Sequence, residues 1–193
     1  EPENMSSFRQ LSRFRFTREK TRVTPGNLQE LSKSLSNSEP APGQYPFPQA
    51  DSMERVLNLV EMLLENSLTK RQISEAFGFH ERQADYYANA AGYLGLATRL
   101  DKGLWVATTD AKRVFGLPFR ERNIEICGLI LRQKVFRSAL DQTLDSGRAL
   151  TKTAIEGILA RTNQASTIAG STLPRRVSTV LGWVRWMQAL ADA

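Results

Sequence analysis

The sequence predicts a mainly α-helical fold with a small β-hairpin, arranged as two helical units in tandem. Apolar residues recur at helical spacing in several runs after residue 52, and capping-type residues and glycines separate these runs. One short segment, LATRLDKGLWVATT, has the character of two strands around a turn. The 193 residues are 41% hydrophobic, which is enough to form the core of one large domain or two small ones.

The first unit is expected over residues 51–118. It opens with an apolar helix, followed by a second helix, KRQISEAF, and a tight turn. The helix ends are marked by Asp51 or Ser52 as an N-cap, Asn66 and Ser67 as a stop, Thr69 as a second N-cap, and Gly78 as a left-handed C-terminal residue.

A third helix is expected from residue 80 or 81 to residue 93 or 94, where Gly95 ends it. The hairpin follows, with its turn at Asp101-Lys102-Gly103, and Trp105 is expected to pack in the core at its base. The predicted order is therefore helix, helix, turn, helix, hairpin.

The second unit is expected over residues 119–193. Two helices run through residues 123–131 and 135–144, and Gly147 ends the second of them. The segment ALTKTAIEGILAR then repeats the pattern of SLTKRQISEAFG weakly, which predicts another helix-turn-helix. A final amphipathic helix begins around Pro174.

Two segments precede these units. Residues 1–23 form a basic arm whose Arg13, Arg15 and Arg18 are candidate phosphate contacts; a flexible tail or a short edge strand is the alternative. Residues 24–50 are rich in Pro and Ser and are expected to form a linker with a short helix. Tyr45 and Phe47 in this segment are suited to pack back on the following domain.

Charge and composition narrow the function classes. The net charge is +6 and the pI is about 9.8, which favours a polyanionic partner. Cys127 is the only cysteine and His80 the only histidine, so neither a disulfide nor a metal or cofactor site is expected. No apolar run approaches the length of a bilayer span and no signal peptide is recognisable, so we expect a cytoplasmic protein without a membrane partner.

The outer side of the third helix carries side chains that suit contacts with base edges in the DNA major groove. The candidates in and around this helix are Thr69, Lys70, Arg71, His80, Arg82, Gln83, Tyr86 and Asn89, with Lys102 at the hairpin tip. Glu81 and Asp85 lie on the same side and reduce its positive charge, so a solvated helix face is the alternative.

The final helix carries a stronger basic cluster near its N-terminus, where the helix dipole favours anions. The candidates are Thr172, Arg175, Arg176, Ser178 and Thr179, with Lys152 at the start of the repeated segment. An exposed basic helix without a ligand is the alternative, and Trp183 and Trp186 are expected to anchor the core or a partner surface.

Two segments carry a resemblance to a known class of protein, LTKRQISEAFGFHERQADYYANAAGYLGL and PRRVSTVLGWVRWM. Together with the predicted order of elements, they resemble a tandem winged helix-turn-helix DNA-binding protein. They also loosely resemble the DNA-recognition region of prokaryotic restriction-modification proteins. This resemblance implies binding of double-stranded DNA, as a regulator or as a recognition module, with any nuclease centre in another domain or chain.

Two other function classes are open. A winged helix can serve as an interaction or dimerisation module, with the C-terminal helix contacting a second copy or a partner protein. A Mg-dependent nuclease would use Asp101, Asp110 and Lys112, whose spacing formally fits such enzymes. Because Asp101 falls at the hairpin tip and Thr109 or Asp110 suits a helix cap, we expect no enzyme centre in this chain.

Overall fold

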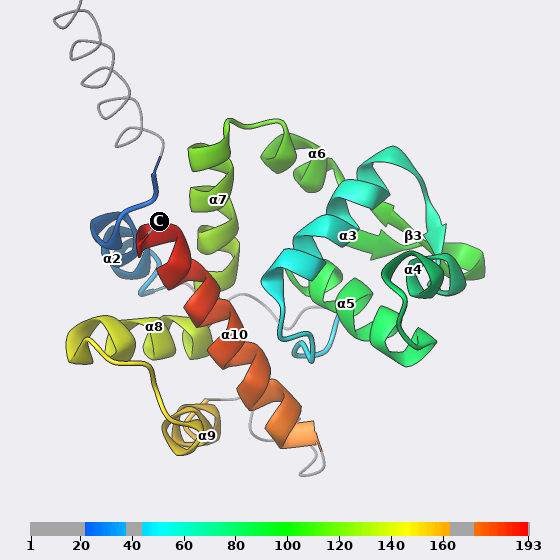
Figure 1. The fold of residues 1–193 in the computed structure, drawn as a ribbon. Helices are drawn as coiled ribbons and strands as arrows, with labels where there is room; N and C mark the ends of the chain where they lie inside the picture. Colours follow the sequence, from blue (N-terminus) through cyan, green and yellow to red (C-terminus); the bar gives the residue numbers. More distant parts are fainter. Residues whose placement is uncertain (1–21, 38–43, 163–171, 193) are drawn as a thin grey trace, which may run out of the picture.

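The computed structural model describes residues 22–37, 44–162 and 172–192 (Figure 1). These residues form a mainly helical protein with a small antiparallel sheet, which confirms the predicted fold class. The first unit contains α3 (Met53–Glu65), β1 (Leu68–Thr69), α4 (Lys70–Phe77), α5 (Glu81–Tyr93), β2 (Ala97–Arg99), the 3-10 turn η1 (Asp101–Gly103), β3 (Leu104–Ala107) and α6 (Thr109–Phe115). It is preceded by α2 (Pro25–Ser34) and followed by α7 (Phe119–Leu131), α8 (Lys134–Ser146), α9 (Lys152–Ala160) and α10 (Leu173–Asp192).

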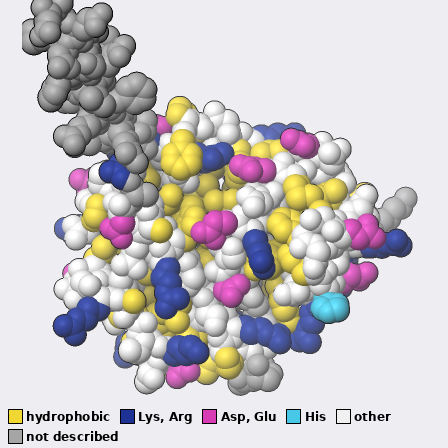
Figure 2. Space-filling model, in the orientation of Figure 1, with side chains coloured by type: hydrophobic (Ala, Val, Ile, Leu, Met, Phe, Trp, Pro, Cys, Tyr) yellow, Lys and Arg dark blue, Asp and Glu magenta, His cyan; other side chains and the backbone are white. Residues whose placement is uncertain are grey.

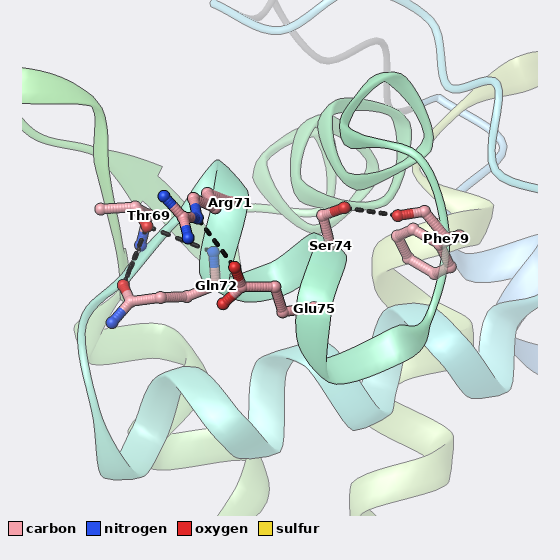
Figure 3. A network of polar contacts seen from close by, with 6 residues as sticks. All are labelled: Thr69, Arg71, Gln72, Ser74, Glu75 and Phe79. Carbon is pink, nitrogen blue, oxygen red and sulfur yellow. Dashed lines mark hydrogen bonds and ion pairs between the residues drawn. The ribbon is translucent and has the colours of Figure 1, made fainter.

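The ends of α4 confirm the predicted turn chemistry (Figure 3). The Thr69 hydroxyl accepts a hydrogen bond from the Gln72 amide at 3.3 Å, and the Gln72 side chain accepts one from the Thr69 amide at 2.8 Å. This reciprocal capping box satisfies amide groups that a helix start leaves unpaired. At the other end, Gly78 has φ 65°, and the Ser74 hydroxyl donates to the Phe79 carbonyl beyond it. The chain therefore reverses between α4 and α5 in the place that the sequence predicts.

The sheet has the strand order β1-β3-β2. The predicted hairpin of β2 and β3 is present, with Ala97 opposite Ala107. The third strand, β1, is not expected from the sequence; its two residues include Leu68, which pairs with Trp105. Trp105 is 2% exposed, which confirms its predicted place in the core.

The second unit is built on α10, which contacts α8 and α9 and also reaches α2 and α3. In Figure 1 it crosses the molecule diagonally, with the sheet, α3, α4 and α5 on one side and α8 and α9 on the other. The repeated LTK segment gives a matching helix start, because the Thr151 hydroxyl caps α9 as Thr69 caps α4. Gly147 ends α8 with φ 62°, as predicted.

The expectation that residues 24–50 form a linker is wrong for the part that the structure describes. α2 packs against α7 and α8, with Leu28 fully buried. Residues 44–51, which we call the strap, lie between α5 and α10 and place Phe47 in the core. Phe47 has an edge contact with Tyr93 of the first unit and stacks on Phe136 of the second. Apolar burial of Phe47 holds this proline-containing segment on the core.

The strap makes the two units share one core. An added Cβ on Gly92 of α5 would lie 2.8 Å from the Tyr45 ring, and one on Gly182 of α10 would lie 2.0 Å from the Asp51 carbonyl oxygen. The Trp183 indole donates to the Ala50 carbonyl at 2.8 Å. The buried apolar residues form a single cluster that runs from α3 and α5 to α8 and α10. The core therefore does not divide at residues 118 and 119.

Among the described helices, none combines the length and apolar character that a membrane crossing requires.

Candidate nucleic-acid interface

α5 is amphipathic in the orientation that the sequence predicts. Ala84, Tyr87, Ala88, Ala91 and, just beyond the helix, Leu94 are buried. Glu81, Arg82 and Gln83 are exposed in the first turn, and Tyr86 and Asn89 are half-buried along the same side. The first turn of α5 therefore presents an arginine and a glutamine to solvent.

Tyr86 joins this face of α5 to the start of α10. Its hydroxyl accepts hydrogen bonds from Arg82 Nε at 2.5 Å and from Arg175 Nη1 at 2.7 Å. Both guanidinium carbons also lie near its ring, at 5.7 Å for Arg82 and 5.4 Å for Arg175 from the centroid. One phenol thus orients two cations that come from different units, through hydrogen bonds and cation–π contacts.

The two arginines of this cluster are not neutralised by ion pairs in the described part of the chain. Among the described residues, no carboxylate forms an ion pair with Arg82 or Arg175. The acids of α5 are compensated from α4 instead, because Lys70 Nζ lies 2.6 Å from Asp85 and 3.8 Å from Glu81. The hydrogen bond to Asp85 raises the pKa of Lys70, so this pairing holds Lys70 in its charged form.

The cluster borders an open groove of about 770 Å³ between the N-terminal ends of α5 and α10. The groove is lined by Gln49, Asp51, His80, Arg82, Gln83, Tyr86, Tyr87, Pro174, Arg175 and Ser178. The positive ends of the α5 and α10 helix dipoles favour negative charge at this place. Figure 2 shows Lys and Arg side chains beside the histidine at the lower right of the view, with acidic side chains above it.

The strap also contributes to this groove, which the sequence did not indicate. Gln49 and Asp51 line it, and the Tyr87 hydroxyl donates to Asp51 at 3.3 Å. The local sequence predicted that Tyr45 and Phe47 pack back on the domain, which is confirmed. These two aromatic residues, which alternate with the prolines, are the feature of the sequence that indicates a segment packed on the domain.

The prediction of a DNA contact is wrong for two residues of α10. Arg176 is only 7% exposed, its guanidinium lies 5.8 Å from the Phe47 ring, and its Nε has no hydrogen-bond partner among the described residues. Burial lowers its pKa. Thr179 is fully buried and its hydroxyl donates to the Arg175 carbonyl at 3.0 Å. One residue along a helix is a rotation of about 100°, so Arg176 points into the core when Arg175 points into the groove.

The remaining predicted residues lie in several places. Thr69 caps α4, and Arg71 is exposed but ion-paired with Glu75 at 2.8 Å. His80 precedes α5 and is exposed, and the Ser178 hydroxyl donates to the Pro174 carbonyl at 3.0 Å. Lys152 is exposed at the start of α9, and Thr172 is half-buried before α10. The side chain of Lys102, at the hairpin tip, lies outside the described residues, as do Arg13, Arg15 and Arg18.

The carboxylates proposed for a nuclease centre are not gathered with others. Asp101 lies in η1, whereas Asp110 lies in α6, 3.6 Å from Arg113. Within the described part of the chain, no group of three or more His, Cys, Asp or Glu side chains is placed to hold a metal ion. The N-cap of α6 is Thr108, and not Thr109 or Asp110 as predicted.

The geometry defines a class of protein in which a helix-helix-turn-helix unit with a small sheet is fused, through a shared core, to a second helical unit. Residues 55–192 match the model of a family described as a domain of unknown function, DUF7226, and the chain belongs to this family. The match spans both units and both arginines of the groove. Comparison with the curated proteins and with the solved structures gives no match.

Proposed function

We propose that this protein binds double-stranded DNA through one surface formed by α5 and the start of α10. The observation that carries the proposal is the Arg82–Tyr86–Arg175 cluster, in which two guanidinium groups line one open groove and form no ion pair with any described carboxylate. Phosphate contacts by such groups supply most of the non-specific affinity of DNA-binding proteins.

The arrangement suits a winged helix-turn-helix mode of binding. In that mode the first turn of the recognition helix enters the major groove, and neighbouring elements contact the backbone. Arg82 and Gln83 occupy the first turn of α5. A DNA strand bordering the major groove would then pass along the α5–α10 groove, within reach of Arg175.

Ion pairing within the first unit supports this account. Glu81 and Asp85 would repel phosphates if they were free, but Lys70 is bound to both. The cation that the sequence suggests as a DNA contact therefore neutralises acids, and the net positive charge is left to Arg82 and Arg175.

Two finer proposals rest on the sequence resemblance. We infer that the binding is sequence-specific, and that the protein acts as a regulator or as the recognition module of a restriction-type system in the cytoplasm of a prokaryotic cell. Any nuclease centre would lie in another domain or chain.

The direct test is fluorescence anisotropy with a randomised duplex and the matching single strand at low salt. We expect the duplex to bind in preference to the single strand, and we expect Arg185→Met, which removes an exposed arginine further along α10, to leave the affinity unchanged. If no duplex binds, the proposal fails and an interaction module becomes the better account. Trp183 and Trp186 are 0% and 8% exposed, so such a module would use other residues of the C-terminal helix.

A further inference from the structure

We propose that Arg82 selects a guanine in the DNA target, that Tyr86 is the positioning residue for its guanidinium, and that Arg175 contacts a phosphate. This inference rests on the proposed function and assigns distinct roles to the two arginines of the groove.

Tyr86 accepts a hydrogen bond from only one nitrogen of the Arg82 guanidinium. Arg82 uses Nε to reach the Tyr86 hydroxyl, at 2.5 Å. Its two terminal nitrogens remain, and they form the end-on fork that matches the O6 and N7 acceptors of guanine in the major groove. Neutral and acidic side chains cannot present this pair of donors.

The two arginines differ in their position relative to the proposed recognition helix. Arg82 is the second residue of α5 and is exposed, and the N-terminal residues of a recognition helix are those that contact base edges. Arg175 comes from a different helix and reaches the Tyr86 hydroxyl from α10, outside the proposed recognition helix. A contact from that side reaches phosphate oxygens, which carry no sequence information.

Tyr86 preorganises both arginines for binding. A free arginine loses side-chain entropy when it binds, whereas here the Tyr86 ring and hydroxyl hold both guanidinium groups before DNA arrives. The two cations also repel one another across a single phenol, and that repulsion is relieved when anionic phosphate enters the groove. The cluster is therefore arranged to favour a polyanion, with Arg82 directed by its bond to Tyr86.

The experiment is selection of bound sequences from a randomised duplex pool, followed by affinity measurements on the selected duplex and on copies with single base changes. The proteins are the unchanged chain, Arg82→Lys, Arg82→Met and Arg175→Met. Arg132→Met, which alters an exposed arginine at the end of α7, is the control. Circular dichroism melting checks that each variant folds.

We expect the unchanged chain to select a motif with a guanine whose replacement lowers affinity roughly 5- to 100-fold. Arg82→Met should remove that preference while other positions of the motif keep theirs. Arg82→Lys keeps the charge but not the planar fork, so it should weaken the guanine preference and keep the affinity for unrelated duplexes. Arg175→Met should weaken binding to all sequences by a similar factor.

Several results would overturn the inference. A motif that survives unchanged in Arg82→Met would show that Arg82 contacts no base. A uniform loss of affinity in Arg82→Met, with preferences intact, would make Arg82 a phosphate contact. Duplex binding without any sequence preference would reject the guanine assignment and leave the proposed function standing, whereas absence of duplex binding would reject both.

Discussion

Arg175 at the start of α10 donates a hydrogen bond to the Tyr86 hydroxyl of α5 at 2.7 Å. This contact brings the arginine of the second unit onto the face of the helix that we propose to enter DNA. The Arg82 side chain shares the same acceptor, so a single hydroxyl fixes both cations of the groove.

Replacement of Tyr86 by Phe tests the importance of that hydroxyl. The ring and its cation–π contacts remain, but both arginines lose an acceptor and must be ordered when DNA binds. Ordering long side chains costs about 0.5–1.5 kcal/mol each, so we expect duplex affinity to fall a few-fold or more. The measurement is anisotropy titration with the selected duplex.

Tyr93→Phe is the matched control, because Tyr93 lies on the same helix and its hydroxyl has no partner among the described residues. We expect its affinity to equal that of the unchanged chain. Equal losses in the two variants, or no loss in Tyr86→Phe, would contradict the positioning role of Tyr86.

The close approach of the strap to α10 makes Gly182 a sensitive position. The Cβ of Gly182→Ala would lie 2.0 Å from the Asp51 carbonyl oxygen, so the strap or the helix must shift. We expect the free energy of unfolding in urea to fall by about 1–3 kcal/mol. Gly157→Ala is the control, because its nearest neighbour would be an Arg161 nitrogen at 3.8 Å, and it should stabilise α9 by about 0.5–1 kcal/mol. Equal behaviour of the two variants would mean that the strap is not tightly docked.

Local features of this fold could be predicted from the sequence, because their causes lie within a few residues. Thr69 and Gly78 mark the ends of α4 through hydrogen bonds and backbone geometry that involve only near neighbours. The pair Arg82 and Tyr86 is also local, since residues four apart lie on one side of a helix. The buried face of α5 followed from the same periodicity.

Long-range features could not be predicted in the same way. The contact between Tyr86 and Arg175 joins residues 89 positions apart, and nothing in either segment specifies the other. The burial of Arg176 did leave a signal, because it lies seven residues before Trp183 and so on the same side of α10. The sequence suggests that Arg175 and Arg176 form one basic surface. Instead, α10 directs Arg175 to the groove and Arg176 to the core.

The N-cap of α6 provides a matched pair of threonines. The Thr108 hydroxyl accepts from the Ala111 amide at 3.1 Å and donates to the Gly95 carbonyl at 2.7 Å, whereas Thr109 is exposed in the first turn. We expect Thr108→Ala to lower the free energy of unfolding by about 1–2 kcal/mol and Thr109→Ala to leave it nearly unchanged. Thermal or urea unfolding measures both, and a larger loss for Thr109→Ala would contradict the observed cap.

Alkaline conditions should destabilise the protein through a buried thiol. Burial raises the pKa of Cys127 from its ordinary value of 9.0 to about 12. Between the unfolded pKa and the folded pKa, the thiol ionises in the unfolded protein but stays neutral in the folded one. Ionisation therefore favours the unfolded protein, and the free energy of unfolding is unaffected below the unfolded pKa and falls as pH rises toward the folded pKa. The free energy of unfolding should therefore fall between pH 9.0 and about pH 12, by up to about 1.4 kcal/mol per pH unit.

Urea unfolding over this range measures the effect, and Cys127→Ala should reduce its slope. Tyr93 contributes in the same direction, because burial raises its pKa as well. A slope unchanged by Cys127→Ala would show that the thiol does not couple to folding.

The most direct test of the joint DNA surface compares two neighbouring arginines. Duplex affinity is measured across a salt series for the unchanged chain, Arg175→Met and Arg176→Met. Arg175 lines the groove and Arg176 is buried, so Arg175→Met should reduce the slope of log affinity against log salt by about one, while Arg176→Met leaves the slope unchanged. A loss of slope in Arg176→Met with none in Arg175→Met would contradict the account.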